Sequence, residues 1–289
     1  MAERSVAQAY KVFLDWQIPS SAEREASARH RSSVETALRD KLSVRNVWET
    51  GSFRHGTGIH NHSDVDVIVS LGATKPLSSD TALKWVKDAL VYRFPTTPIR
   101  VSRPAVVVNF AGGLERWEVI PGFYRGQEQS WNVFDIPAPG GGWMETAPSA
   151  HLKYVTQQNE DPKGGAKSLA RLLKVWKYSN NVPVSSFYLE MRAARYMRDE
   201  PFFEASQDFA TMMERLAASG LAAMNDPMGI SGRIGATSTE AYRSTALATL
   251  RGDAIRARSA LELEKIGKAS DAFYKLNEIF PGRFPSRFY

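Results

Sequence analysis

The run from Asp64 to Leu71 (DVDVIVSL) constrains the fold most, because it is an apolar strand that carries two acids. Side chains alternate between the two faces of a strand, so Asp64 and Asp66 share one face and the valines that follow them share the other. Two neighbouring carboxylates repel each other and are costly to remove from water. A divalent cation is the usual group that offsets this cost. The run therefore predicts a sheet with a charged site on one face.

The order of the expected elements divides the chain into two halves. The first half mixes helices, predicted over 4–18, 22–43 and 79–92, with strands over 46–50, 64–71, 104–110 and 116–120. Gly112 and Gly113 lie between the last two strands and indicate a hairpin. After the Gly/Pro-rich loop 137–148, helical patterns cover 148–159, 162–180, 185–198, 204–219 and 237–270. We therefore expect a lobe of strands and helices over 1–147 and a helical lobe over 148–289.

Composition excludes several classes of protein. The chain has 289 residues, enough for one large domain or two ordinary ones, and it has no cysteine, so disulfides and thiolate metal sites are excluded. No apolar run approaches the roughly 18 residues of a membrane span, and the N-terminal run does not look like a secretion signal. We expect a cytoplasmic protein. The net charge of +6 favours anionic partners such as nucleotides, although a solvated basic surface without a partner is the alternative.

A glycine turn and a later strand supply the other parts of a candidate site. Gly51 permits close approach of the backbone to a ligand, and Ser52 offers a hydroxyl and an N–H to phosphate oxygens. A phosphate-binding turn beside carboxylates suits phosphoryl or nucleotidyl transfer. Two-metal chemistry of this kind needs a third carboxylate on a neighbouring strand. Glu118, in the middle of the strand RWEVI, is the natural candidate, whereas Glu115 is expected to be exposed.

Each of these signals, taken alone, also fits a residue without a catalytic or binding role. A pair of acids at the start of a strand is more often a surface feature than a metal site, and it is the spaced combination with Gly51, Ser52 and Glu118 that indicates catalysis. Three histidines in the loop suggest a metal, but shaping of the loop is the favoured interpretation. The weaker candidates are His55, His60 and His62 for a metal, Arg54 and Arg125 for phosphates, and Trp131, Asn132 and Asp135 for a base edge.

These motifs resemble a known signature. Gly51-Ser52, the run 56–59 (GTGI) and the run 63–67 (SDVDV) resemble the polymerase-β-like nucleotidyltransferase superfamily, and WEVIPGF resembles its third-acid strand. Within it, the chain is most similar to the bacterial cyclic GMP-AMP synthase/DncV-like nucleotidyltransferases, which make cyclic oligonucleotide signals in anti-phage (CBASS) defence. The resemblance covers most of the chain. It implies an α+β fold, a mixed sheet flanked by helices, with a helical C-terminal lobe and the active site in the cleft between the lobes.

The helical half carries a second part of the resemblance. The run 168–190 (SLARLLKVWKYSNNVPVSSFYLE) resembles the family's triphosphate-binding helix and the serine-bearing turn that follows it. The nucleotide-binding candidates are Lys174, Lys177, Ser185, Ser186 and Phe187, of which Lys177 and Ser186 match the phosphate ligands best and Phe187 matches a base-stacking position. A solvated lysine, a plain helix cap and a core phenylalanine are the respective alternatives.

The resemblance also implies an activity. Asp64, Asp66 and Glu118 would be catalytic and would hold two Mg²⁺ ions, for which Mn²⁺ can substitute; many relatives carry Asp where Glu118 stands. The expected enzyme is template-independent and monomeric, and it condenses NTPs (ATP and/or GTP, with pyrimidine NTPs an option) into a cyclic product that a separate effector protein reads. Direct activation by DNA is not expected, because the zinc insertion of the animal enzyme needs cysteines. The alternatives are an RNA or tRNA terminal transferase and a catalytically silent nucleotide-binding scaffold.

Overall fold

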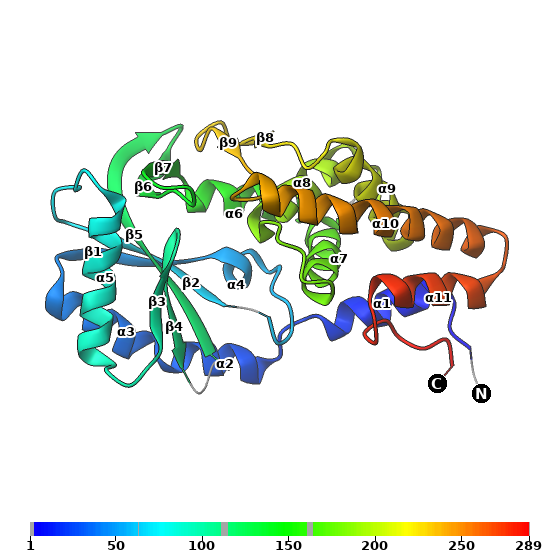
Figure 1. Ribbon diagram of the computed structural model, residues 1–289, viewed down its shortest axis with the longest axis horizontal. Coiled ribbons are helices and arrows are strands. Elements are labelled where there is room, and N and C mark those ends of the chain that lie inside the picture. Colours follow the sequence, from blue (N-terminus) through cyan, green and yellow to red (C-terminus); the bar gives the residue numbers. More distant parts are fainter. Residues whose placement is uncertain (1–2, 63, 111–114, 161–163, 289) are drawn as a thin grey trace. The chain divides into compact units, whose positions relative to one another are not determined.

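The computed structural model describes residues 3–62, 64–110, 115–160 and 164–288, and the chain forms two compact units. The first, which we call the sheet unit, comprises Pro19–Lys153 and Met228–Gly232. The second, the helical unit, comprises Met1–Ile18, Tyr154–Pro227 and Arg233–Tyr289. Figure 1 labels the elements of both.

A mixed sheet organises the sheet unit. Its strands are β1 (Val44–Thr50), β2 (Val65–Leu71), β3 (Ile99–Ser102), β4 (Ala105–Phe110), β5 (Glu115–Glu128), β6 (Trp131–Pro137) and β7 (Trp143–Thr146). The order is β1-β2-β5-β4-β3; β2 and β5 are parallel and the other pairs are antiparallel. The long strand β5 pairs with β2 and β4 through its first half and with β6 through its second half, and β6 in turn pairs with β7.

Two helices, α3 (Arg31–Lys41) and α5 (Ser79–Arg93), cover one face of this sheet. The unit also contains α2 (Ser21–Arg29), which precedes α3, and the short helix α4 (Gly51–His55), which follows β1. The valines of β2 alternate with Asp66, Ile68 and Ser70, and Val65, Val67 and Val69 are buried in the same core cluster as residues of α3 and α5. Figure 1 shows α3 and α5 lying against the strands. Because the valines point toward α3 and α5, Asp66 points to the opposite face.

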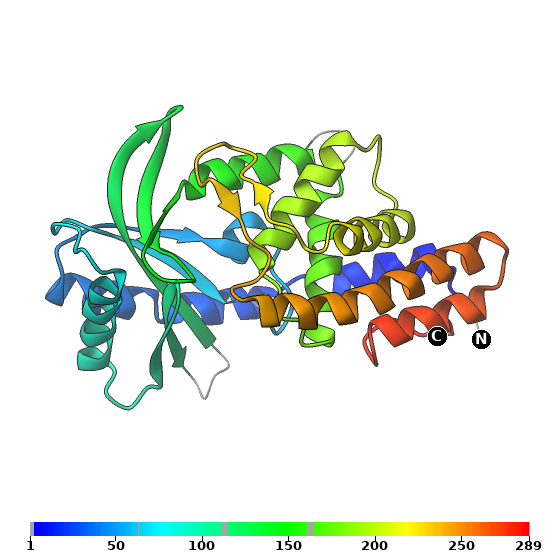
Figure 2. The ribbon, with the colours of Figure 1, turned by 45° about the horizontal axis from the view of Figure 1, so that its top comes forward.

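The helical unit is formed by α1 (Val6–Trp16), most of α6 (Pro148–Glu160), α7 (Ala166–Ser179), α8 (Ser186–Asp199), α9 (Ala205–Ala218), α10 (Glu240–Lys265) and α11 (Ala269–Ile279). A short pair of strands, β8 (Met224–Asn225) and β9 (Arg233–Ile234), precedes the long helix α10, which Figure 2 shows along its length. None of the helices in the described residues combines the length and the apolarity that a bilayer crossing requires.

The N-terminal helix packs with the end of the chain, whereas the sequence places it with the lobe of strands. The Phe13 ring lies 4.9 Å from the Phe280 ring and 5.1 Å from the Phe284 ring, and Tyr10 lies 5.2 Å from Phe284. Four aromatic or apolar side chains of α1 are buried there. Burial of these large rings assigns α1 to the helical unit, a long-range contact that no local pattern reveals.

The α+β fold with a helical C-terminal part is confirmed, and two differences concern helix breaks. The expected helix 22–43 is two helices, since His30 precedes α3, stacks on Phe110 at 3.9 Å and bonds Glu115. The expected helix 237–270 is α10 followed by α11, with Gly267 at φ +77° between them. Strands β4 and β5 pair antiparallel as expected, but Gly112 and Gly113 lie outside the described residues. Strands β6 and β7 were not predicted.

Candidate active site

The third acid lies on the strand beside the first two. In the parallel pairing of β2 and β5, Asp66 is the register partner of Glu118, and Val65 is the partner of Trp117. Asp64 immediately precedes β2 and lies two residues before Asp66, so it shares the same face. All three acids are half-buried. The structure thus gathers the three predicted acids at one end of two neighbouring strands.

Gly51 brings the backbone against one of these acids. Thr50 ends β1 as the register partner of Asp66, and Gly51 then turns the chain at φ +67° into the short helix α4. A Cβ atom on Gly51 would lie 1.8 Å from Asp66 Oδ2, closer than any real contact. Both the left-handed backbone and the missing side chain are therefore required here. The adjacent Ser52 is the second residue of α4 and is half-buried.

Arg116, which the sequence analysis did not single out, contacts two of the acids. Its Nη1 lies 3.5 Å from Asp64 Oδ2, and its Nη2 donates a hydrogen bond to Glu118 Oε1. Arg116 precedes Glu118 by two residues on β5 and thus lies on the same face of the strand. That spacing was the available signal, but a lone arginine is usually a solvated side chain. The structure shows instead a cation placed between two carboxylates.

The donor set has the chemistry of a magnesium site, but the side chains are not arranged around an ion. Carboxylate oxygens are the ligands that Mg²⁺ prefers. In this structure the guanidinium of Arg116 lies between Asp64 and Glu118. Across residues 3–62, 64–110, 115–160 and 164–288, no three carboxylate or histidine side chains are close enough together to hold a metal. The width of the guanidinium between the two acids is a physical reason for that separation.

Glu23 of α2 anchors the loop that leads to Asp64. It accepts a hydrogen bond from the backbone N–H of Asn61 at 2.8 Å, and its Oε2 lies 2.7 Å from His60 Nδ1. Burial raises the pKa of Glu23, but the hydrogen bonds from Asn61, Ser20 and His60 together outweigh burial and lower this pKa to about 2. Ser20, which precedes α2, accepts a hydrogen bond from the Glu23 N–H at 3.2 Å. The carboxylate therefore stays ionised and holds the loop.

Two of the predicted phosphate ligands meet in the helical unit. Lys177, in the last turn of α7, donates to Ser186 Oγ at 2.7 Å, and Ser186 is the first residue of α8. Tyr178 OH lies 3.4 Å from the same oxygen. A lysine and a hydroxyl at this distance offer a charge and a hydrogen bond to one phosphate group. Phe187, the next residue of α8, is half-buried.

Two further candidates have structural tasks instead. Lys174 is 1% exposed, and its Nζ lies 2.9 Å from Glu190 Oε1 in a buried ion pair between α7 and α8. An ammonium buried in this way is not presented to phosphates. Ser185 is the N-cap of α8, where its side chain accepts from the Tyr188 N–H at 3.2 Å. In this structure the side chains of Lys174 and Ser185 thus bind other parts of the protein, and their role in nucleotide binding stays a prediction.

The weaker candidates are also placed. The expectation that Glu115 is exposed is wrong: it is 7% exposed, its Oε2 lies 2.8 Å from His30 Nδ1, and its Oε1 accepts from Trp117 Nε1 at 2.9 Å. Trp131, Asn132 and Asp135 lie in strand β6 and not in a loop. Asp135 is buried, and its Oδ2 lies 2.5 Å from Nζ of the exposed Lys75. Arg125 pairs with Glu145. His55 is buried at the end of α4, whereas His60 contacts Glu23.

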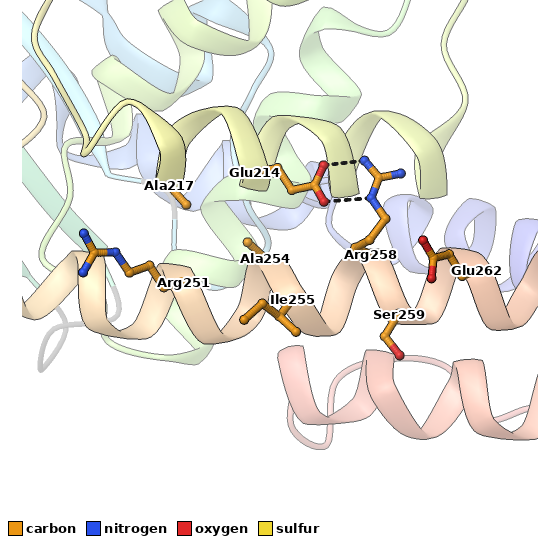
Figure 3. A pocket seen from close by; sticks show the side chains of 8 residues that line it. All are labelled: Glu214, Ala217, Arg251, Ala254, Ile255, Arg258, Ser259 and Glu262. Carbon is orange, nitrogen blue, oxygen red and sulfur yellow. Dashed lines mark hydrogen bonds and ion pairs between the residues drawn. The ribbon is translucent and has the colours of Figure 1, made fainter.

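Hollows occur in both units. In the sheet unit, a cavity of about 290 Å³ lies beside the end of β1 and is lined by Thr50, Arg54, Asn132 and Phe134, among others. In the helical unit, a hollow of about 600 Å³ lies between α9 and α10, and Figure 3 shows Arg258 pairing with Glu214 across it. Ala217, Ala254 and Ile255 provide its apolar wall. The first cavity adjoins the Gly51 turn, whereas the second has none of the predicted catalytic residues.

Comparison with known proteins places these features in a family. The model of the Second Messenger Oligonucleotide or Dinucleotide Synthetase (SMODS) domain matches residues 5–159, which is more than half of the chain. A cyclic AMP-AMP-AMP synthase of Escherichia coli strain MS 115-1 is 25% identical over 206 residues, covering 68% of this chain and 62% of that enzyme. The chain thus matches less than two thirds of the length of this relative.

Solved structures show the same fold. The structure of E. coli MS115-1 CdnC with ATP aligns with a TM-score of 0.75 at 17% identity and covers 97% of this chain and 99% of that one. The Bradyrhizobium diazoefficiens CD-NTase CdnG with GTP aligns with a TM-score of 0.68 at 13% identity and covers 94% and 96%. Together with the family match over residues 5–159, these observations show that the chain belongs to the Second Messenger Oligonucleotide or Dinucleotide Synthetase family.

Proposed function

We propose that this protein is a template-independent nucleotidyltransferase that condenses NTPs into a cyclic di- or oligonucleotide signal and releases pyrophosphate, in CBASS anti-phage defence. The observation that carries the proposal is the juxtaposition of Asp66 and Glu118 on parallel strands, with Asp64 on the same face and the Gly51 backbone against Asp66. Family membership and the relative named a cyclic AMP-AMP-AMP synthase support the reaction class.

Some of these residues would bind metal ions, and the others would position the nucleotide. Asp64, Asp66 and Glu118 would hold divalent cations, Mg²⁺ or Mn²⁺, which neutralise phosphate charge and lower the pKa of an attacking hydroxyl. Gly51 and Ser52 present backbone and hydroxyl groups to the donor triphosphate. In the helical unit, Lys177 and Ser186 bind phosphate oxygens, and Phe187 offers a ring on which a base can stack.

The bond changes follow from this arrangement. A ribose hydroxyl oxygen of the acceptor, oriented by Glu118, attacks the α-phosphorus of the donor NTP, the bond to pyrophosphate breaks, and the hydroxyl proton passes to solvent water. A second transfer within the linear product closes the ring. Positioning and charge neutralisation supply most of the rate increase in such a site. We further propose that ATP or GTP is a substrate, that the enzyme acts as a monomer in the cytoplasm, and that a separate effector reads the product.

The test is a product assay. The full chain is incubated with four labelled NTPs and Mg²⁺ or Mn²⁺ without template, the products are treated with phosphatase, and the double variant Asp64→Asn/Asp66→Asn is run beside it. We expect phosphatase-resistant product from the wild type and none from the variant. Label that appears only when tRNA is added would instead identify an RNA terminal transferase. NTP binding without any product would identify a silent scaffold.

A further inference from the structure

We propose that Arg116 is a built-in counter-ion of the catalytic acids, which its guanidinium must leave before they can take a divalent cation. The inference rests on the proposed function, because it assumes that Asp64 and Glu118 hold metal. It assigns to Arg116 a positioning role that controls how tightly the site binds its cation.

The contacts define the role. Arg116 Nη1 lies 3.5 Å from Asp64 Oδ2, and Nη2 donates a hydrogen bond to Glu118 Oε1, so one positive charge contacts two acids from two neighbouring segments and offsets part of their combined negative charge. The side-chain exposures are 36% for Arg116, 30% for Asp64 and 23% for Glu118. At this burial, opposite charges attract each other more than on an open surface, yet water still reaches the site. The pairing is therefore strong enough to compete with a cation and weak enough to be displaced.

Arg116 lies beside the acids but cannot itself ligate the metal. It occupies the same strand face as Glu118, two residues away, and a guanidinium has only donors and no atom that can ligate a cation. Its buried Nε has no hydrogen-bond partner within the described part of the chain. In this arrangement the Nε–H of Arg116 thus donates no hydrogen bond within the described residues. After Arg116 leaves the acids, its planar donors match the oxygens of a phosphate.

Competition with the cation predicts an order of metal affinity. Arg116→Gln removes the positive charge, so Asp64 and Glu118 attract Mn²⁺ without competition from this guanidinium. We expect this variant to bind Mn²⁺ about tenfold more tightly than the wild type, which corresponds to about 1.4 kcal/mol. Arg116→Lys keeps the charge, but its single ammonium cannot bridge both acids as a guanidinium does. This variant should therefore bind about two- to threefold more tightly than the wild type.

The experiment measures Mn²⁺ binding to the full chain without nucleotide, from the electron paramagnetic resonance signal of free Mn²⁺. Arg125→Gln is the matched control, because Arg125 lies on the same strand and pairs with other carboxylates, Glu145 and Asp135. Its Mn²⁺ affinity should equal that of the wild type. Asp64→Asn establishes that the bound Mn²⁺ is at the acids, since it should weaken binding at least tenfold.

A second readout covers the case in which a variant is unstable. In EDTA, Arg116→Gln should melt below the wild type, because its acids have lost their counter-ion, and Mn²⁺ should raise its melting temperature more than that of the wild type. If Asp64→Asn weakens binding but both Arg116 variants bind Mn²⁺ no more tightly than the wild type, the counter-ion role is refuted and the proposed metal site stands. If Asp64→Asn leaves Mn²⁺ binding unchanged, the metal site itself is refuted, and the counter-ion role with it.

Discussion

Replacement of Gly51 by alanine tests whether the close approach of the backbone to Asp66 matters for catalysis. The new Cβ would lie 1.8 Å from Asp66 Oδ2, and real Cβ contacts essentially never fall below 3.0 Å, so the carboxylate must move by about 1 Å or more. A misplacement of that size costs on the order of 100-fold in rate. The left-handed backbone at φ +67° adds about 1 kcal/mol of strain to the folded state.

Gly142→Ala is the matched control for this prediction. Gly142 has φ +71° in the same unit, between β6 and β7, but nothing lies within 4 Å of its would-be Cβ. Both variants should lose about 1 kcal/mol in urea unfolding, with some further loss at Gly51 from the displaced carboxylate. Only Gly51→Ala should lose roughly 100-fold in pyrophosphate release from NTPs. If the two variants lose activity equally, the close approach to Asp66 does not position a catalytic group.

Three further predictions concern the other contacts. Lys177→Met should raise KM for NTP roughly 10- to 100-fold with little change in urea unfolding, because a hydrogen bond to a charged group is worth roughly 1.5–3 kcal/mol; an unchanged KM would refute phosphate binding there. Lys174→Met should destabilise the fold by about 3–5 kcal/mol, since Glu190 is left buried without its partner, and Lys174→Met/Glu190→Leu should recover most of that loss; a destabilisation under 1 kcal/mol would contradict the buried ion pair. The folded pKa of Glu23 is lowered from 4.5 to about 2, so its stabilising contribution is complete above pH 4.5 and is lost as the pH falls toward 2. The stability difference between wild type and Glu23→Gln, about 1 kcal/mol, should thus shrink across that window in acid unfolding, and a difference that persists at pH 2 would be inconsistent with this.

The site could be predicted from sequence where chemistry and strand period coincide. Asp64, Asp66 and Glu118 each interrupt or open an apolar strand, and a charge in such a place needs a partner, so their pattern indicates both a face and a task. The sequence did not reveal the role of Arg116, because an arginine two residues before an acid has the pattern of any solvated strand residue. Only the pairing of β2 with β5 shows that it faces Asp64 as well as Glu118.

The helical unit shows the limit of local patterns most clearly. Lys174 and Lys177 lie three residues apart on one helix and are equivalent candidates by spacing. Packing of α8 against α7 buries the first against Glu190 and leaves the second beside Ser186. The burial of a long side chain depends on the neighbouring helix, which its own sequence does not specify.

By itself, the sequence determined the parts that depend on local periodicity and residue chemistry: the strand with two acids on one face, the glycine turn, the third acid and the change to helices near residue 148. Tertiary structure alone decided which distant side chains meet. It packed α1 against Phe280 and Phe284 and buried Glu115 in contact with His30. It also put Arg116 between Asp64 and Glu118. Alternation of side chains is a property of neighbouring residues, whereas these contacts join residues far apart in the chain and follow from how whole elements pack.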